Sequence, residues 1–354
     1  MRGILIAASM ALVLSLVGTP LVIRFFRRRG YGQLIRADGP QAHMSKRGTP
    51  TMGGTAMIVS AVVAYLVARM VTWYPDRASI PFDRALSAGG LLAIGMFTGM
   101  GAVGFIDDYI KLRRNRSLGL SKTAKFAGQG LIAVAFAIGA EYVAATSTNL
   151  SFIGVLDLDF GPYFPLFCFV ILSAASNGVN LTDGLDGLAA GTSALLFGAY
   201  VVIAFWIFRH QPDYSEAAWI HADALAVAAA AAMGAALGFL WWNAPPARIF
   251  MGDTGSLAIG GMLAALAVLT ETELLLVILG GLYVIETASV ILQVFTFRLF
   301  GRRVFKMAPL HHHFELSGWQ ETTVIVRFWI IGGLAVAFGL GLFYAEYLAR
   351  AGSG

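Results

Sequence analysis

Five aspartates border the hydrophobic stretches of this chain, and their positions are the feature most able to support chemistry. They lie in three short segments: GFIDDY with Asp107 and Asp108, NLTDGLDGL with Asp183 and Asp186, and MGDTGS with Asp253. A carboxylate at or near membrane depth is costly, so it marks a functional site by default. Mg²⁺ takes one or two protein carboxylates and fills its other positions with water and phosphate oxygens. The pattern predicts a magnesium site that acts on a phosphate-bearing substrate.

Two of these segments also have ordinary structural explanations. Asp107 and Asp108 could form a solvated helix end paired with Lys111 on the next turn. Adjacent helical residues point about 100° apart, so one acid can face a site while the other braces a neighbouring segment. Asp253 could simply cap the apolar helix that follows it. The functional alternative for Asp253 is a Mg²⁺ ligand.

The segment NLTDGLDGL is more specific, because capping by Thr182 or Asp183 explains one polar residue and not three. Asn180, Asp183 and Asp186 recur at three-residue spacing, which predicts that they share one face of a helical turn. The adjacent glycines allow a ligand or a neighbouring backbone to approach closely. We therefore expect this segment to line the same site.

Other polar segments add hydrogen-bond donors. Lys46 and Thr51 lie in KRGTPTMGG at the start of a span, where exposed backbone N–H groups suit phosphate, although the segment is no Walker loop. The histidines of PLHHHFE diverge on a helix, so binding a phosphate or bracing the loop fits better than zinc. Glu286 is either a buried packing acid or part of a lipid-facing groove, and Gln293, two turns further on, is placed to reach the site.

Composition identifies the class of protein that carries these residues. Hydrophobic residues make up 58% of the 354 residues and charged residues 13%, whereas soluble domains have about 25% charged residues. We predict an all-α polytopic membrane protein, a single transmembrane domain over 1–354. The lone Cys168 excludes an intrachain disulfide and a thiolate metal site. Ten spans are expected, at 3–23, 52–73, 86–106, 124–145, 164–181, 187–208, 222–242, 255–271, 274–297 and 323–348.

Basic residues orient these spans. Of the 25 lysines and arginines, 19 fall in one set of connections, which the positive-inside rule assigns to the cytoplasm, with both termini on the outer side. The +5 net charge follows this pattern, so it does not indicate nucleic-acid binding. All five aspartates and the histidines share the cytoplasmic side, and the outer connection 147–163 alternates like a short β-hairpin. The cytoplasmic set comprises 24–51, 107–125, 178–187, 243–254 and 298–327.

The chain resembles the polyprenyl-phosphate N-acetylhexosamine-1-phosphate transferases. The resemblance covers nearly the whole chain and rests on the ten-span layout and on KRGTPTMGG, FIDDY, NLTDGLDGL, NAPPARIFMGDTGSL and PLHHHFE. It implies a bacterial inner-membrane enzyme, dependent on Mg²⁺ and homodimeric, with an active-site cleft at the cytoplasmic face. HHHFE indicates the members that transfer phospho-N-acetylmuramoyl-pentapeptide from its UDP conjugate to undecaprenyl phosphate, giving lipid I and UMP.

The resemblance also assigns roles to residues. Asp253 would bind Mg²⁺, and Asp107 would act on the lipid phosphate as base or orienter, with Asp108 beside it. The diphosphate and sugar would meet Lys46, Thr51, Asn180, Asp183, Gln293, His311, His312 and His313. A uridine pocket would be formed by Gly184, Leu185, Asp186, Asn243 and Phe250.

Alternatives remain open at this point. One is an enzyme that uses UDP-N-acetylglucosamine, and another is a cation-coupled transporter, although transporter sites lie near the midplane between repeats. The lipid phosphate could attack directly, or an aspartate could first form a phospho-enzyme. Direct attack is favoured, because a phosphate monoester is already an anionic nucleophile.

Overall fold

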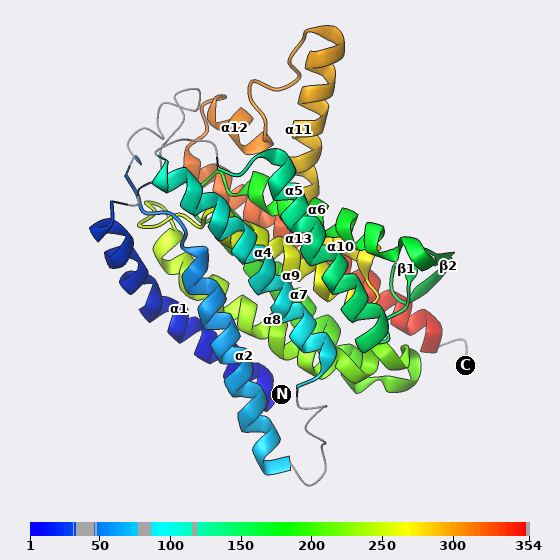
Figure 1. Ribbon diagram of the computed structural model, residues 1–354. Helices are drawn as coiled ribbons and strands as arrows, with labels where there is room; N and C mark the ends of the chain where they lie inside the picture. The colour runs from blue at the N-terminus through cyan, green and yellow to red at the C-terminus, as the bar shows by residue number, and fades with distance from the viewer. Residues whose placement is uncertain (31, 33–45, 47, 77–85, 115–118, 352–354) are drawn as a thin grey trace.

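Long helices make up most of the computed structural model, which describes residues 1–30, 32, 46, 48–76, 86–114 and 119–351 (Figure 1). Ten helices in these ranges are long and apolar enough to cross a membrane, so the predicted number of spans is confirmed. They are formed by α1 (Arg2–Arg28), α2 (Gly54–Asp76), α4 (Ala88–Arg113), α5 (Lys122–Ile138) together with the turn that follows it to Val143, α6 (Phe164–Thr182) together with the turn that precedes it from Gly161, α7 (Leu188–Arg209), α8 (Glu216–Asn243), α9 (Gly252–Leu269), α11 (Gly281–Phe300) and α13 (Glu321–Ala351).

Shorter elements connect these helices. The short hairpin predicted in the connection 147–163 is confirmed: β1 (Asn149–Ser151) pairs antiparallel with β2 (Val155–Asp159). Two short helices, α10 (Glu273–Leu279) and α12 (Leu310–Glu315), flank α11. The remaining pieces are a π-helical turn at Gly139–Val143 and 3-10 turns at Gly161–Tyr163 and Gln211–Asp213.

Among the differences from the expected bounds of the spans, two change the description of the bundle. The third, expected at 86–106, continues as α4 to Arg113, so Asp107 and Asp108 lie inside the helix rather than at its end. The ninth, expected as one span at 274–297, is broken at Gly280 into α10 and α11. Part of the expected connections lies outside the described residues, namely 31, 33–45 and 47 in 24–51, and 115–118 in 107–125.

Glycines allow the central helices to approach closely. A Cβ at Gly234 of α8 would lie 2.1 Å from the carbonyl oxygen of Ala8 in α1. A Cβ at Gly104 of α4 would lie 2.1 Å from the carbonyl oxygen of Asp253 in α9. Small residues at helix contacts are typical of membrane bundles. The second contact brings the start of α9 directly against the acidic turn of α4.

The predicted functional residues gather at one end of the bundle. α9 begins there with Asp253, and its other end leads to Glu271, whose carbonyl accepts a hydrogen bond from Gly154 N in the hairpin at 3.1 Å. α1 runs parallel to α8 toward the Asp253 end, and α13 starts at that end with Glu321. The start of α1 and the end of α13 therefore lie toward the hairpin end of the bundle (Figure 1).

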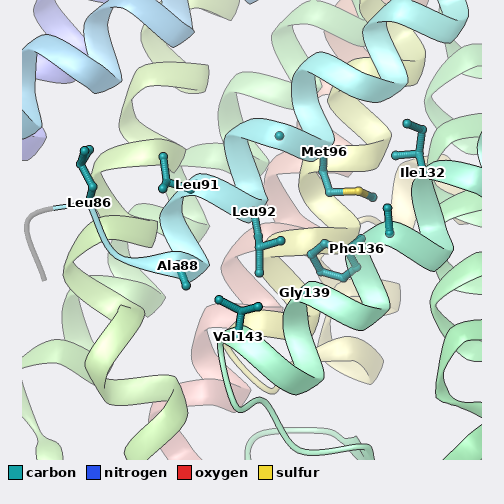
Figure 2. Close-up of a pocket in the computed structure, with 11 residues that line it drawn as sticks. Leu86, Ala88, Leu91, Leu92, Met96, Ile132, Phe136, Gly139 and Val143 are labelled. Atoms are coloured by element: carbon teal, nitrogen blue, oxygen red, sulfur yellow. The ribbon is translucent and has the colours of Figure 1, made fainter. Parts of the chain in front are cut away.

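A separate apolar pocket of 610 Å³ lies between α4 and α5 (Figure 2). It sits near the start of α4, and therefore at the opposite end of that helix from Asp107 and Asp108. Its lining offers no titratable side chain, so we do not include it in the candidate site. The lining residues are Leu86, Ala88, Leu91, Leu92, Gly95, Met96, Ile132, Ala135, Phe136, Gly139 and Val143.

Candidate active site

Three of the five aspartates form one cluster. Carboxylate oxygens of Asp107, Asp108 and Asp253 all lie within 4.8 Å of one another. Among the described residues, this is the one group of three or more acid, histidine or cysteine side chains close enough to hold a metal ion. Lys111 lies against all three acids, with its Nζ 2.6 Å from Asp107, 3.7 Å from Asp108 and 3.0 Å from Asp253.

The two adjacent acids have different surroundings, as their helical positions predict. Asp107 Oδ1 accepts a hydrogen bond from Leu120 N at 2.7 Å. Asp108 Oδ2 accepts hydrogen bonds from the backbone N–H and the hydroxyl of Thr254, at 2.9 and 2.8 Å. Gly252 is required beside Asp108, because it has a φ of +73° and a Cβ there would lie 2.5 Å from Asp108 Oδ2.

Asp253 is held by side chains from three other helices. Its Oδ2 contacts Lys111 of α4 and, at 2.7 Å, Nζ of Lys125 at the start of α5. Its Oδ1 accepts a hydrogen bond from Asn180 Nδ2 of α6 at 2.8 Å. No side-chain capping bond forms at the start of α9, so the capping alternative for Asp253 is wrong. The oxygen-rich cluster suits a hard cation such as Mg²⁺.

The turn 183–187 between α6 and α7 carries the other two aspartates. α6 ends at Thr182, so the expectation that Asn180, Asp183 and Asp186 share one helical face is wrong. Burial, together with the negative charges of Asp253, Asp108 and Asp186, raises the pKa of Asp183 well above its usual range. This electrostatic coupling links the turn to the acidic cluster.

A second charged group joins three distant segments. Lys46 Nζ lies 2.9 Å from Asp186 Oδ1 and 2.5 Å from Glu321 Oε1. Asp186 Oδ2 accepts a hydrogen bond from Ala247 N at 2.9 Å, and Asp186 N donates to Glu321 at 3.3 Å. Burial lowers the pKa of Lys46, but the hydrogen bonds and charges of Glu321 and Asp186 outweigh it, and the net shift is upward.

The residues expected around the uridine lie close to this charged group. Asn243 Oδ1 accepts a hydrogen bond from Gly187 N at 3.0 Å, and its Nδ2 donates to the Ile249 carbonyl at 2.9 Å. Leu185 is buried in a small apolar cluster with Leu188. Gly184 lies against His311. The turn and the segment that follows α8 are thereby fixed to each other.

Phe250 and Thr51 lie on two paired stretches of backbone. Phe250 N donates to the Pro50 carbonyl at 2.8 Å, and the Phe250 carbonyl accepts from Gly53 N at 2.9 Å. Thr51 is buried, and its hydroxyl lies 3.0 Å from where a Cβ at Gly252 would sit. The segment that contains KRGTPTMGG is therefore placed beside the start of α9.

The three histidines occupy α12, and each has a different environment. His311 Nδ1 lies 3.1 Å from Glu286 Oε1. His312 Nδ1 lies 2.7 Å from Glu315 Oε2, and His313 Nδ1 accepts from Lys306 N at 3.1 Å. Among the described residues, the candidate metal group contains none of these histidines.

The side chains of Gln293 and Glu286 both hydrogen-bond to backbone groups. The Gln293 amide accepts from Val304 N and Phe305 N and donates to the Phe305 carbonyl. It therefore fixes the loop after α11. Glu286 is fully buried against α12, which agrees with the first of its two alternatives, the buried packing acid.

Sequence reasoning missed three charged residues of the site. Lys111 was considered only as the partner of a solvated helix end, and its contact with Asp253 joins residues 142 positions apart. Lys125 and Glu321 were missed entirely. Their contacts span 128 and 275 positions. The only local signal was the i,i+4 spacing of Asp107 and Lys111.

Comparison with known proteins gives the family. Residues 90–271 match the profile of glycosyl transferase family 4. The chain is 56% identical to the phospho-N-acetylmuramoyl-pentapeptide-transferase of Frankia casuarinae, over 99% of this chain and 100% of that protein. The chain belongs to glycosyl transferase family 4. Within this family it is a transferase related over its full length to proteins of that name from Rhodococcus opacus (51% identical) and Streptomyces griseus (53%), with 99% of this chain and 100% of each relative aligned.

The family match covers part of the candidate site. The acidic cluster, Asn180 and the turn 183–187 all fall inside residues 90–271. Lys46, Glu286, Glu321 and the helix α12 fall outside the matched range, yet they contact the turn or its supports. The candidate site therefore also includes residues from the N-terminal segment and from the last three helices.

Proposed function

We propose that the protein transfers phospho-N-acetylmuramoyl-pentapeptide from its UDP conjugate to undecaprenyl phosphate, giving lipid I and UMP. This is the first membrane step of peptidoglycan synthesis. The names of the full-length relatives favour this donor over UDP-N-acetylglucosamine. The observation that carries the proposal is the convergence of Asp107, Asp108 and Asp253 with Lys111 and Lys125 at one end of ten apolar helices.

Magnesium is the proposed cofactor, with Asp253 as its ligand and Asp107 and Asp108 beside it. Bound magnesium would supply positive charge to the diphosphate. Phosphoryl transfer depends mainly on positioning and on neutralising phosphate charge. Lys111 and Lys125 already place two ammonium groups at Asp253. In the favoured direct route, Asp107 orients the lipid phosphate, which attacks the donor's β-phosphate, and UMP leaves.

The donor is proposed to lie between the acidic cluster and α12. Gly184, Leu185, Asp186, Asn243 and Phe250 would form the uridine pocket, with Phe250 offering an aromatic face to the base. The diphosphate and sugar would lie near Lys46, Thr51, Asn180, Asp183, Gln293, His311, His312 and His313. The contacts of Lys46 and Asn180 with the proposed uridine and metal residues support this arrangement.

We propose that the cleft opens at the cytoplasmic face of the bacterial inner membrane, where undecaprenyl phosphate enters from the bilayer. The concentration of lysines and arginines in the connections at the Asp253 end supports this orientation. The hairpin and both termini would then be periplasmic. A single domain over 1–354 and a homodimer belong to the same proposal, and no nucleic-acid partner is expected.

The test is release of UMP that requires both substrates and Mg²⁺. Purified protein is incubated with undecaprenyl phosphate and either UDP-N-acetylmuramoyl-pentapeptide or UDP-N-acetylglucosamine. Release from the muramoyl donor alone supports the proposal, and release from the glucosamine donor alone would replace it with the second reaction. Exchange of labelled UMP into the donor without lipid would favour the phospho-enzyme route over direct attack.

A further inference from the structure

His311 has one ring nitrogen that the fold leaves without a partner. The side chain is fully buried, and its Nε2 makes no hydrogen bond within the described part of the chain. Buried polar atoms in native proteins are nearly always hydrogen-bonded, so an exception requires an explanation. A ligand that is present only during the reaction is one such explanation.

The other ring nitrogen is held by Glu286 of α11. Glu286 is also fully buried. Its Oε1 lies 3.1 Å from His311 Nδ1, and its Oε2 accepts a hydrogen bond from Leu310 N at 2.7 Å. α12 has no side-chain cap of its own at Pro309, so this carboxylate also fixes where the helix begins.

A carboxylate at Nδ1 determines what Nε2 can do. The carboxylate accepts the Nδ1–H, which fixes the orientation of the ring. A ring that carries a hydrogen on both nitrogens donates from Nε2 as well. Nε2 is the one ring nitrogen of His311 that has no partner among the described residues.

Gly184 shows what His311 Nε2 faces. A Cβ at Gly184 would lie 2.3 Å from His311 Nε2, so any other residue there would collide with the ring. The nitrogen therefore lies directly against the Asp183–Asp186 turn, beside the proposed diphosphate region. For a ligand to reach Nε2, this turn must shift.

We propose that Glu286 is a positioning residue that acts through His311. Its carboxylate holds the imidazole at Nδ1 so that Nε2 donates a hydrogen bond to an anionic oxygen of the donor's diphosphate. This inference rests on the proposed function and adds to it a residue and the atom through which that residue acts.

Two isosteric substitutions separate the two ring nitrogens. In His311→Asn the amide nitrogen occupies the place of Nδ1. This variant keeps the contact with Glu286 and loses the hydrogen-bond donor at the position of Nε2. In His311→Gln the amide nitrogen occupies the place of Nε2. This variant loses the contact with Glu286 and keeps the hydrogen-bond donor. We expect kcat/KM for the UDP substrate to fall on the order of 10- to 100-fold further in His311→Asn than in His311→Gln. This difference corresponds to one charge-assisted hydrogen bond. The KM for undecaprenyl phosphate should not change.

A purely structural role predicts the reverse order, because His311→Asn preserves the buried contact. Equal losses in the two variants, or a smaller loss in His311→Asn, would overturn the inference. Thermal unfolding of each purified variant shows that the comparison is made between folded proteins.

A double-mutant cycle tests the role of Glu286. Glu286→Gln should retain more activity than Glu286→Ala, because its amide can still hold the ring. In a His311→Ala background, Glu286→Ala should cause little further loss; a full additional loss would mean that Glu286 acts independently of His311. Ser289→Ala is the matched control, since Ser289 is buried on the same helix and its hydroxyl donates to the backbone carbonyl of Glu286 rather than to its carboxylate. A wild-type protein that releases no UMP would overturn both proposals, whereas active wild type with additive variants would overturn only this one.

Discussion

Lys111 should act as a built-in substitute for a divalent cation, and its removal provides a quantitative test. In Lys111→Met, three carboxylates within 4.8 Å of one another lose the ammonium group that all of them contact. We expect the variant to be less stable than wild type when EDTA is present. We also expect added Mg²⁺ to close most of that difference.

The magnitude follows from burial. At an effective dielectric constant of about 20, two unit charges roughly 3 Å apart attract by about 5 kcal/mol, most of which desolvation offsets. Removing one partner of a buried pair costs about 3–5 kcal/mol, and an exposed pair contributes about 0–1 kcal/mol. Lys111 is 31% exposed while Asp107 is 4% exposed, so we expect a loss of about 2 kcal/mol.

A bound cation can offset a loss of this size. A ligand at 100 times its Kd stabilises the folded state by about 2.7 kcal/mol. In wild type the cation must displace Lys111 from the carboxylates, whereas in the variant it does not. The stabilising effect of Mg²⁺ should therefore be larger in Lys111→Met and should begin at lower concentration.

The assay is thermal unfolding in lipid nanodiscs, across a Mg²⁺ titration from EDTA to saturation. Lys122→Met is the control, because Lys122 is an exposed residue at the start of α5. Equal melting temperatures of wild type and Lys111→Met in EDTA would refute the reasoning. So would a difference that persists unchanged at saturating Mg²⁺.

Three further predictions concern other parts of the molecule. Asp253→Asn should abolish UMP release while the protein stays folded; near-normal turnover at saturating Mg²⁺ would contradict its role. Phe250→Ala should raise the KM for the UDP donor more than it lowers kcat, and an unchanged KM would count against the aromatic contact. Burial raises the pKa of Glu273 to about 8, so the folded state holds a proton that the unfolded chain has released. This stabilisation is complete below the ordinary glutamate pKa and is lost as pH rises to about 8. Glu273→Gln should flatten the melting temperature over that window, and an unchanged slope would exclude Glu273 as its origin.

Local sequence patterns were sufficient for the spans and for the types of residue in the site. Hydropathy predicted ten spans, because each buried or lipid-facing helix is apolar along its length. It ended the third span too early, since it treats Asp107 and Asp108 as charged residues in water. In the structure Lys111, Leu120 and Thr254 satisfy these carboxylates, so the helix continues past them.

Contacts between distant segments could not be predicted in the same way. The pairing of Lys46 with Glu321 depends on how α13 packs beside the turn that follows α6. The break at Gly280 also depends on packing, since nothing in the apolar run 274–297 signals a boundary apart from its glycines. Such features depend on how the helices pack together, and no periodic pattern in the sequence indicates them.

The position of α11 has a consequence for how the enzyme is handled. Its buried residues, Leu282, Tyr283, Glu286 and Ser289, all lie in its first half, and its second half projects from the bundle (Figure 1). Apart from the loop that Gln293 binds, this half exposes apolar side chains such as Ile291, Phe295 and Leu299. Hydrocarbon chains can cover them in a bilayer, so the tilt of α11 would respond to bilayer thickness. Glu286 lies on this helix and binds the start of α12 through Leu310 N and His311. A change in acyl-chain length, or a detergent with a short chain, would therefore shift the position of the histidines. Lipid composition would then be an experimental variable on a par with pH or metal concentration.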